Sequence, residues 1–403
     1  MILDSQKKLY RTKIDQFIKR LEALILSKYE LLEAEFANSK DPVPFGERLR
    51  LQYQRIEEGQ EWGQAWESAW FHLQGRIPEK WQEQEVVAHL DFNGEALIFS
   101  PQGDPLQGLT NGSVFGNVTR HTFILTPKAQ GGETVDLWVE GAANSIVGIN
   151  QPSDPPRGTV DRHGNYLGKV NRMRIARFHR ELYALRLDME LLNGLLDTVP
   201  EFSTRHARIL KSLVESTNGF RDDPDRAGIC REILAPLLAH PAHSSAPTLI
   251  TVGHAHIDTG FLWPVRETIR KAGRTFASQL DLIERYPDYV FGASQPQHYQ
   301  FVKDHYPNLY ERIKKAVAEG RWELQGGMWV EPDCNLISGE SMVRQVMHGK
   351  NFFMDEFGVE VTNCWIPDVF GYSASMPQIL KSAGIHYLLT QKMSWSQFNR
   401  FPY

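Results

Sequence analysis

Residues 248–258, Thr-Leu-Ile-Thr-Val-Gly-His-Ala-His-Ile-Asp, decide the fold expected for the C-terminal part of the chain. An apolar strand at Thr248–Val252 ends in a polar tip, and a helical pattern over 264–285 follows. The same rhythm then recurs, with strands predicted at Tyr289–Phe291, Trp322–Leu324, Asn363–Ile366 and Tyr387–Leu389 and helices at 299–318, 338–356 and 375–383. Strands that alternate with helices indicate a parallel sheet, open or barrel-like, with right-handed crossovers. Chemistry in such folds gathers where the strands end.

The first strand tip carries the strongest chemical signal. His254, His256 and Asp258 alternate along it, so in an extended segment they project to one side. Two imidazoles and a carboxylate suit a divalent transition metal, and zinc is the usual ion for mixed nitrogen and oxygen ligands. A single histidine is more often a hydrogen-bonded core residue or a surface residue than a metal ligand. Two histidines followed by an aspartate at the end of a strand favour a metal site instead. Asp368, at the fourth tip, could complete the site, act as a nucleophile or cap the next helix.

The other strand tips are polar as well, which is typical of a pocket for a carbohydrate or another polar substrate. Glu331, Asp333 and Asn335 follow the paired glycines of the third tip and offer contacts to a ligand, unless they form a plain turn with solvated acids. Aromatic residues close to the tips could stack on sugar faces or belong to the core: Phe261, Trp263, Trp329, Phe370 and Trp395.

The N-terminal half has a different organisation. A three- and four-residue apolar period that includes Leu32 predicts a helix over 8–36. From about 62 to 150 the period changes to two, and Asn93-Gly94 suggests a hairpin between the strand ending at Phe92 and Ala96–Phe99. The stretch therefore predicts an antiparallel β-sandwich. A linker at 150–165 and helices at 172–197 and 204–218 follow.

Composition excludes several classes of protein. The 403 residues contain 44 basic and 49 acidic side chains, a formal charge of −5, which argues against nucleic-acid binding. Three cysteines without a paired spacing imply reduced thiols, and no secretory signal or membrane-spanning run is found, so we expect a cytoplasmic protein.

Four motifs, in order, resemble family 38 of the glycoside hydrolases, the class II α-mannosidases, and most closely their cytosolic-type branch. They are His254-Ala-His-Ile-Asp258, Gly326-Gly-Met-Trp-Val-Glu331, Pro367-Asp-Val-Phe-Gly-Tyr372 and Leu389-Thr-Gln-Lys-Met-Ser-Trp395. The resemblance implies a retaining glycosidase with one zinc ion in a seven-stranded barrel. By motif position His256 and Asp258 match zinc ligands, and Asp368 matches the nucleophile, which also touches the zinc. Phe370 and Lys392 match substrate-contacting positions, and Asp333 is a further candidate contact. Phe261 takes the position of an aromatic platform that is commonly tryptophan in the family, so we expect a different stacking surface here.

The expected fold class is α/β plus all-β, with an N-terminal helix and an antiparallel β-sandwich before an incomplete (β/α)7-type barrel. The expected domains are a helical segment (1–60), a β-sandwich (61–160), a helical connector (161–247) and a truncated, metal-dependent glycosidase domain (248–403). By motif, the family's remaining zinc histidine and its general acid lie downstream of the fifth strand. We therefore expect an N-terminal fragment that is inactive alone.

The predicted function is hydrolysis of terminal α-linked mannose from oligosaccharides. The expected partner is a mannose-containing oligosaccharide, with no nucleic acid or membrane and with homo-oligomerisation possible. Two other functions stay open. A metal-dependent deacetylase or amidohydrolase also begins with His-x-His at the first barrel strand, but it needs further histidines at later tips. A non-catalytic carbohydrate-binding fragment would explain the sandwich and the missing acid.

Overall fold

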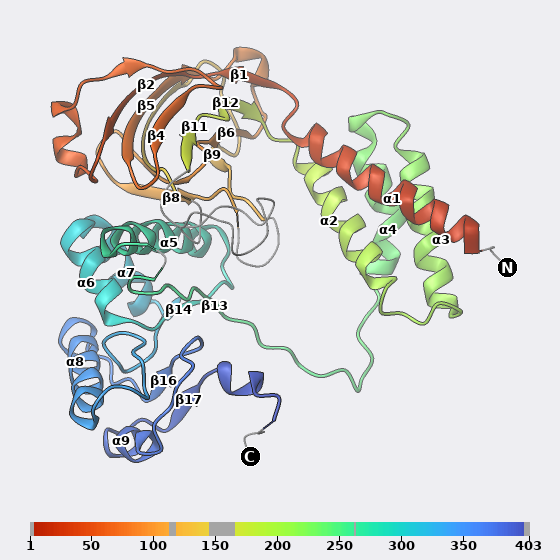
Figure 1. The fold of residues 1–403 in the computed structure, drawn as a ribbon. Helices are drawn as coiled ribbons and strands as arrows, with labels where there is room; N and C mark the ends of the chain where they lie inside the picture. The colour runs from red at the N-terminus through yellow and green to blue at the C-terminus, as the bar shows by residue number, and fades with distance from the viewer. Residues whose placement is uncertain (1–3, 113–117, 145–165, 262, 399–403) are drawn as a thin grey trace.

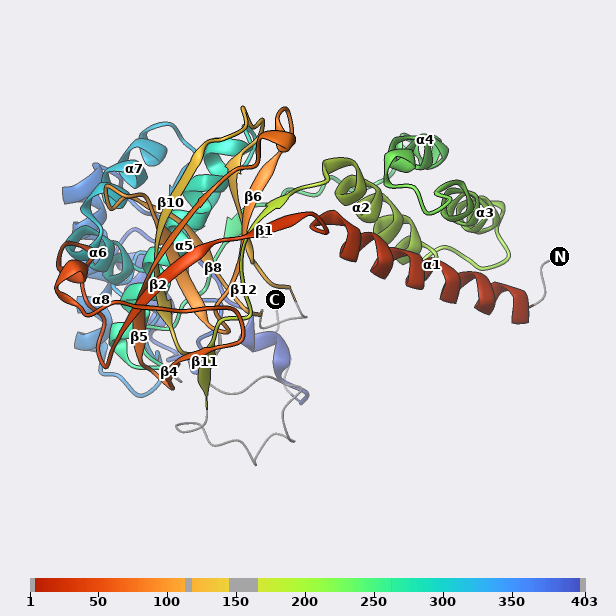
Figure 2. The same cartoon turned by 90° about the horizontal axis from the view of Figure 1, so that it is seen from above.

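The computed structural model describes residues 4–112, 118–144, 166–261 and 263–398, in three units (Figure 1). A β-sandwich lies above a C-terminal α/β unit, and a helical bundle stands to one side, as the view from above also shows (Figure 2). The linker predicted at 150–165 lies outside the described residues. No helix in the described ranges is long and apolar enough to cross a membrane.

Two antiparallel sheets form the sandwich, as predicted. The first has the strand order β3-β2-β5-β10-β7-β8 and the second β1-β12-β6-β9, while β11 pairs with β4 alone. The strands are β1 Tyr29–Leu31, β2 Glu33–Ser39, β3 Gln54–Arg55, β4 Glu61–Gln64, β5 Ser68–Arg76, β6 Val86–Asp91, β7 Glu95–Phe99, β8 Pro105–Leu109, β9 Thr122–Thr126, β10 Thr134–Ala142, β11 Leu167–Lys169 and β12 Arg172–Arg177. Two 3-10 helices, η1 Phe45–Arg50 and η2 Glu79–Trp81, lie between them.

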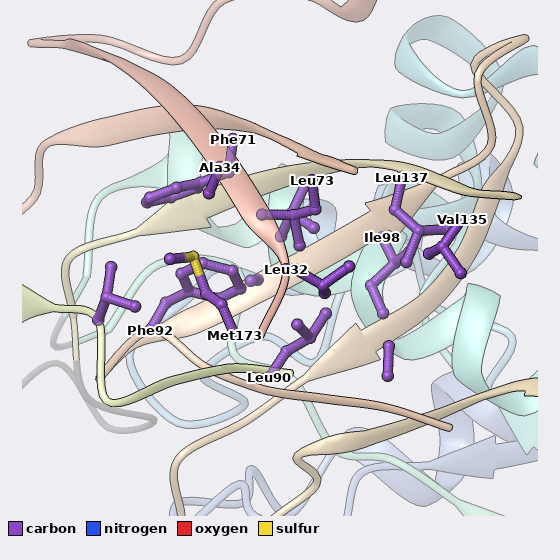
Figure 3. Close-up of a cluster of buried hydrophobic side chains, with 14 of the residues drawn as sticks. Leu32, Ala34, Phe71, Leu73, Leu90, Phe92, Ile98, Val135, Leu137 and Met173 are labelled. Carbon is purple, nitrogen blue, oxygen red and sulfur yellow. The ribbon is translucent and has the colours of Figure 1, made fainter. Parts of the chain in front are cut away.

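The core between the sheets is made by alternate residues of the strands. Figure 3 shows ten of its labelled members: Leu32, Ala34, Phe71, Leu73, Leu90, Phe92, Ile98, Val135, Leu137 and Met173. The helix predicted over 8–36 is therefore wrong in its second half. It ends at Ile25. Leu32, directly before β2, alternates with Ala34 and Phe36 of that strand, and all three lie in the sandwich core.

The predicted hairpin at Asn93-Gly94 is also wrong. β6 pairs with β12 and β9, whereas β7 pairs with β10 and β8, so the turn carries the chain from one sheet to the other. Asn93 takes a positive φ of 50°, and its amide donates to Asp91 Oδ1 at 3.0 Å. A Cβ at Gly94 would lie 2.2 Å from the carbonyl oxygen of Ala142, so the crossing requires glycine.

Four helices pack into the bundle around one apolar core. They are α1 Asp4–Ile25, α2 Arg180–Leu195, α3 Thr204–Gly219 and α4 Ala227–Leu238, with η3 Pro224–Arg226 before the last. The helix predicted over 172–197 begins only at Arg180, because residues 172–177 complete the sandwich as β12.

The C-terminal unit alternates short parallel strands with helices, as predicted. β13 Gly253–His254, β14 Phe291–Ala293 and β15 Trp322–Leu324 form one sheet, and β16 Asn363–Trp365 pairs with β17 Tyr387–Leu389. The helices are α5 Val265–Arg285, α6 Pro296–His305, α7 Pro307–Ala318, α8 Gly339–Phe357, α9 Met376–Ser382 and η4 Lys392–Trp395.

Three details of this unit differ from the prediction. The first strand is not Thr248–Val252, where Ile250 is 90% exposed, but Gly253–His254, because pairing with β14 begins at Gly253. The second strand lies two residues later than expected. The helix predicted over 299–318 is two helices that break at Pro307, since proline cannot donate to the preceding turn.

α5 attaches the C-terminal unit to the sandwich. Trp70, Phe99 and Trp138 on the outer face of the six-stranded sheet share one apolar cluster with Phe276 of this helix. β8 approaches so closely that a Cβ at Gly108 would lie 2.8 Å from a backbone oxygen of α5. Because α5 begins directly after the first strand tip, this packing fixes the start of the candidate site.

Candidate active site

His256, Asp258 and Asp368 lie together at the strand tips. Each offers one ligand atom, and these atoms all lie within 4.8 Å of one another. His256 Nε2 is 3.2 Å from Asp258 Oδ1 and 3.8 Å from Asp368 Oδ2, so the same nitrogen faces both carboxylates. Among the described residues, this is the group of three or more such side chains that could hold a metal ion. The structure thus brings together the three ligands predicted from the sequence.

The first turn of α5 holds the loop that carries His256 and Asp258. The buried Thr268 hydroxyl accepts from the amide of Gly260 at 3.0 Å and lies 3.3 Å from the carbonyl oxygen of Asp258. Gly260 has a φ of 81°, a conformation that side chains with a Cβ rarely adopt. The loop therefore turns sharply back toward the helix after Asp258.

His254 is absent from the cluster, although the alternation predicted that it would project with His256. Its Nδ1 lies 2.9 Å from the carbonyl oxygen of Gly292, and its Nε2 accepts from Trp365 Nε1 at 3.1 Å. Burial lowers the pKa of His254, which favours the neutral ring that this pair of bonds requires. β13 ends at His254, so strand alternation does not extend to His256. His254 links three strands and is not available as a ligand.

Lys392 lies beside the candidate nucleophile. Its Nζ is 2.8 Å from Asp368 Oδ1 and 3.8 Å from the ring centroid of Trp395. The two carboxylate oxygens of Asp368 therefore have different neighbours, with Oδ1 on the ammonium group and Oδ2 facing His256. This arrangement fixes the orientation of the carboxylate.

A buried carboxylate lies on the other side of the His256 ring. Glu331 Oε2 is 2.9 Å from His256 Nδ1, and the Glu331 side chain is only 5% exposed. Burial lowers the pKa of His256, but the carboxylates of Asp258 and Glu331 raise it by more than burial lowers it. Together these effects raise the pKa of His256 to about 10. The sequence indicated Glu331 only as a general ligand contact, because its approach to His256 joins the tips of different strands.

The predicted aromatic residues fall into two groups. Phe261, Phe370 and Trp395 are exposed. Trp263 and Trp329 are half-buried and donate their indole N–H groups to Thr268 Oγ1 at 3.1 Å and Gln297 Oε1 at 3.0 Å, so they serve the framework.

Asp333 lies in the turn after the third tip. Its Oδ1 accepts from the amides of Leu336 and Asn335 at 2.7 and 2.8 Å, and these bonds lower its pKa. At least one of its oxygens therefore serves the turn, and a contact with substrate stays a prediction.

Sequence reasoning missed the polar residues behind the loop. Gln295 and His298 are buried, and Thr259 Oγ1 lies 3.0 Å from both Gln295 Oε1 and His298 Nε2. The polar tip Ser294-Gln-Pro-Gln297 gave a weak signal for Gln295. No local pattern could indicate its partners, because they follow a different strand.

Comparison with known proteins agrees with this architecture. Residues 246–403 match the profile described as "Glycosyl hydrolases family 38 N-terminal domain", and residues 29–176 match "Alpha-mannosidase, jelly roll domain". The match of residues 246–403 to this family's N-terminal domain confirms the resemblance drawn from the motifs. The jelly-roll match spans nearly the same residues as strands β1 to β12.

Particular relatives are α-mannosidases. Human "Alpha-mannosidase 2C1" is 34% identical over 90% of this chain, and the α-mannosidase of Saccharomyces cerevisiae is 29% identical over 88%. The chain spans about a third of the length of these enzymes, 34% and 33% respectively. A solved α-mannosidase from Enterococcus faecalis is 28% identical over 34% of this chain and 16% of its own, with a TM-score of 0.33.

Proposed function

We propose that this chain supplies the metal-binding and nucleophilic side of a retaining α-mannosidase active site that acts on terminal α-linked mannose in oligosaccharides. The observation that carries the proposal is the meeting of His256, Asp258 and Asp368 at one point. These side chains come from two strand tips that are more than 100 residues apart in the sequence. The family 38 domain and the α-mannosidase relatives support the substrate class.

The donor set fits zinc. One imidazole nitrogen and two carboxylates converge on a partly exposed position, and zinc accepts such mixed ligands while leaving room for substrate. When bound, zinc would supply a Lewis acid that grips neighbouring sugar hydroxyls and stabilises developing charge. The incomplete (β/α)7-type barrel is part of the same proposal, with the described strands as its first members.

Asp368 would act as the nucleophile. In a retaining glycosidase a carboxylate oxygen forms a bond to the anomeric carbon while the bond to the leaving oxygen breaks, and water later releases the sugar. Lys392 holds Asp368 Oδ1 at 2.8 Å and so limits rotation of the carboxylate before attack. The exposed rings of Phe261 and Phe370 are proposed as stacking surfaces for sugar, and Asp333 as a further polar contact.

An activated substrate tests this proposal without a general acid. Dinitrophenolate leaves from 2,4-dinitrophenyl α-mannoside without protonation, so the zinc-loaded chain should release it and retain a mannosyl group on the Asp368 peptide, detectable by mass spectrometry. Asp368→Ala should abolish both signals, while Asp288→Asn, at an exposed carboxylate on another loop, should preserve them. Release that is undiminished in Asp368→Ala would refute the assignment of the nucleophile.

The geometry of the described residues does not favour the deacetylase. His298, which that function would recruit after the second strand, is buried and bonded to Thr259, and His254 is committed to Gly292 and Trp365. Release of acetate from acetylated sugars, with no reaction of the mannoside, would reverse this preference. Sugar binding without turnover would support the non-catalytic fragment. A cytoplasmic location and homo-oligomerisation stay predictions from the sequence.

A further inference from the structure

Glu331 is a buried carboxylate whose two oxygens have different surroundings. Oε1 accepts from Ser294 Oγ at 2.9 Å and from Gln295 Nε2 at 3.4 Å. Oε2 faces His256 Nδ1 in an ion-pair contact at 2.9 Å and makes no hydrogen bond to the other described residues. A carboxylate this deeply buried is costly unless cations or donors compensate it. Its position is therefore determined by Ser294 and Gln295 on one side and by His256 on the other.

The buried amide of Gln295 makes this arrangement rigid. Its Nε2 donates to the carbonyl oxygen of Ile257 at 2.7 Å, and its Oε1 accepts from the Glu331 amide at 3.2 Å and from Thr259 Oγ1 at 3.0 Å. One side chain thus ties the loop on both sides of Asp258 to the backbone of Glu331. Gln295 therefore holds both the loop that follows His256 and the backbone of Glu331.

We infer that Glu331 is a positioning residue that keeps the proton of His256 on Nδ1 and presents the lone pair of Nε2 to a divalent cation. The inference rests on the metal site proposed above. A histidine ligand commonly donates its second N–H to a carboxylate, which fixes the tautomer and the ring orientation. Here Nε2, the nitrogen opposite Glu331, is the one that faces Asp258 and Asp368.

Charge balance supports a divalent ion at this position. With His256 neutral, as a metal-bound imidazole must be, the carboxylates of Asp258, Asp368 and Glu331 and the ammonium group of Lys392 carry formal charges that sum to −2. A cation of charge two brings the sum to zero, which favours a partly buried site.

Zinc titration of the whole chain, in competition with a chromophoric chelator, tests the inference. Glu331→Ala should weaken Zn²⁺ binding by about 10- to 100-fold, the usual effect of removing the partner of a histidine ligand. The Zn²⁺ affinity of Glu331→Gln should lie between those of Glu331→Ala and wild type. An amide oxygen can still accept from the Nδ1–H of His256, but it carries no charge. Glu323→Gln, an exposed glutamate on β15, is the matched control and should bind Zn²⁺ as wild type does.

A spectroscopic readout separates positioning from general stability. In the zinc-loaded wild type, 15N NMR should show the metal on Nε2 of His256 and a proton on Nδ1 that exchanges slowly with solvent, whereas the same proton should exchange rapidly in Glu331→Ala. If Glu331→Ala fails to fold, Ser294→Ala removes only the support of Oε1 and should weaken binding by a smaller factor.

Two results would overturn the inference in different ways. Zinc affinity in Glu331→Ala within about threefold of wild type, together with loss of binding in His256→Ala, would remove the role of Glu331 and leave the proposed metal site intact. Unchanged affinity in His256→Ala would refute the metal site and the inference with it.

Discussion

Glu95 and Lys271 form a buried ion pair between the sandwich and α5, and breaking it should destabilise the chain strongly. Both side chains are almost completely buried, and Glu95 Oε2 also accepts from Asn144 Nδ2 at 2.9 Å and from Arg274 at 3.4 Å. Glu95→Gln or Lys271→Met alone removes the nearest opposite charge from a group that stays buried. Each should lower the free energy of unfolding by about 3–5 kcal/mol, the usual effect of removing one member of a buried pair.

The double variant distinguishes a coupled pair from two independent losses. Glu95→Gln with Lys271→Met should cost at least about 1.5 kcal/mol less than the sum of the single changes, because neither charge is then left alone. Urea unfolding followed by tryptophan fluorescence measures the cycle, since Trp70 and Trp138 lie at this interface.

An exposed pair provides the control for this cycle. Lys80 Nζ lies 3.0 Å from Glu30 Oε1, but both side chains are about half or more exposed, so the coupling there should stay below about 1 kcal/mol. A coupling at Glu95–Lys271 no larger than the one at Glu30–Lys80 would refute the reasoning.

Two further predictions concern packing and pH. Gly108→Ala should destabilise the chain by about 1–3 kcal/mol, because the added Cβ meets the α5 backbone near Arg274. Gly228→Ala, in α4, adds its Cβ to open space and should stabilise the chain by about 0.5–1 kcal/mol. Thermal unfolding of both variants measures the two effects. Burial, with the nearby charge of His256, lowers the pKa of His298 to about 3. The unfolded chain protonates His298 below about pH 6.5 and the folded chain does not, so wild type should lose about 2 kcal/mol from this group between pH 7 and pH 5. His298→Gln should reduce that loss, while the exposed His240→Gln should not.

Sequence patterns identified the candidate metal ligands but not the residues that orient them. His256, Asp258 and Asp368 could be predicted because polar residues gather where parallel strands end, and they do so here although β13 and β16 lie in separate sheets. His254 was wrongly grouped with them, since the alternation rule applies only while the chain stays in a strand, and β13 ends at that residue. The hairpin at Asn93 failed for a related reason. Strands β6 and β7 are buried on both faces, so their sequences do not indicate to which of the two sheets each strand belongs.

The residues that orient the site are recognisable only from the assembled fold. Thr268 holds the loop after Asp258, and it lies on the same helix whose Lys271 pairs with Glu95 of the sandwich. α5 therefore connects the packing of the two units to the position of Asp258, one of the proposed metal ligands. A shift of this helix would move the backbone of Asp258, whereas Asp368 follows β16 and is not attached to the helix. Because α5 holds the backbone of Asp258 and packs on the sandwich, the sandwich is part of the support for this side of the site.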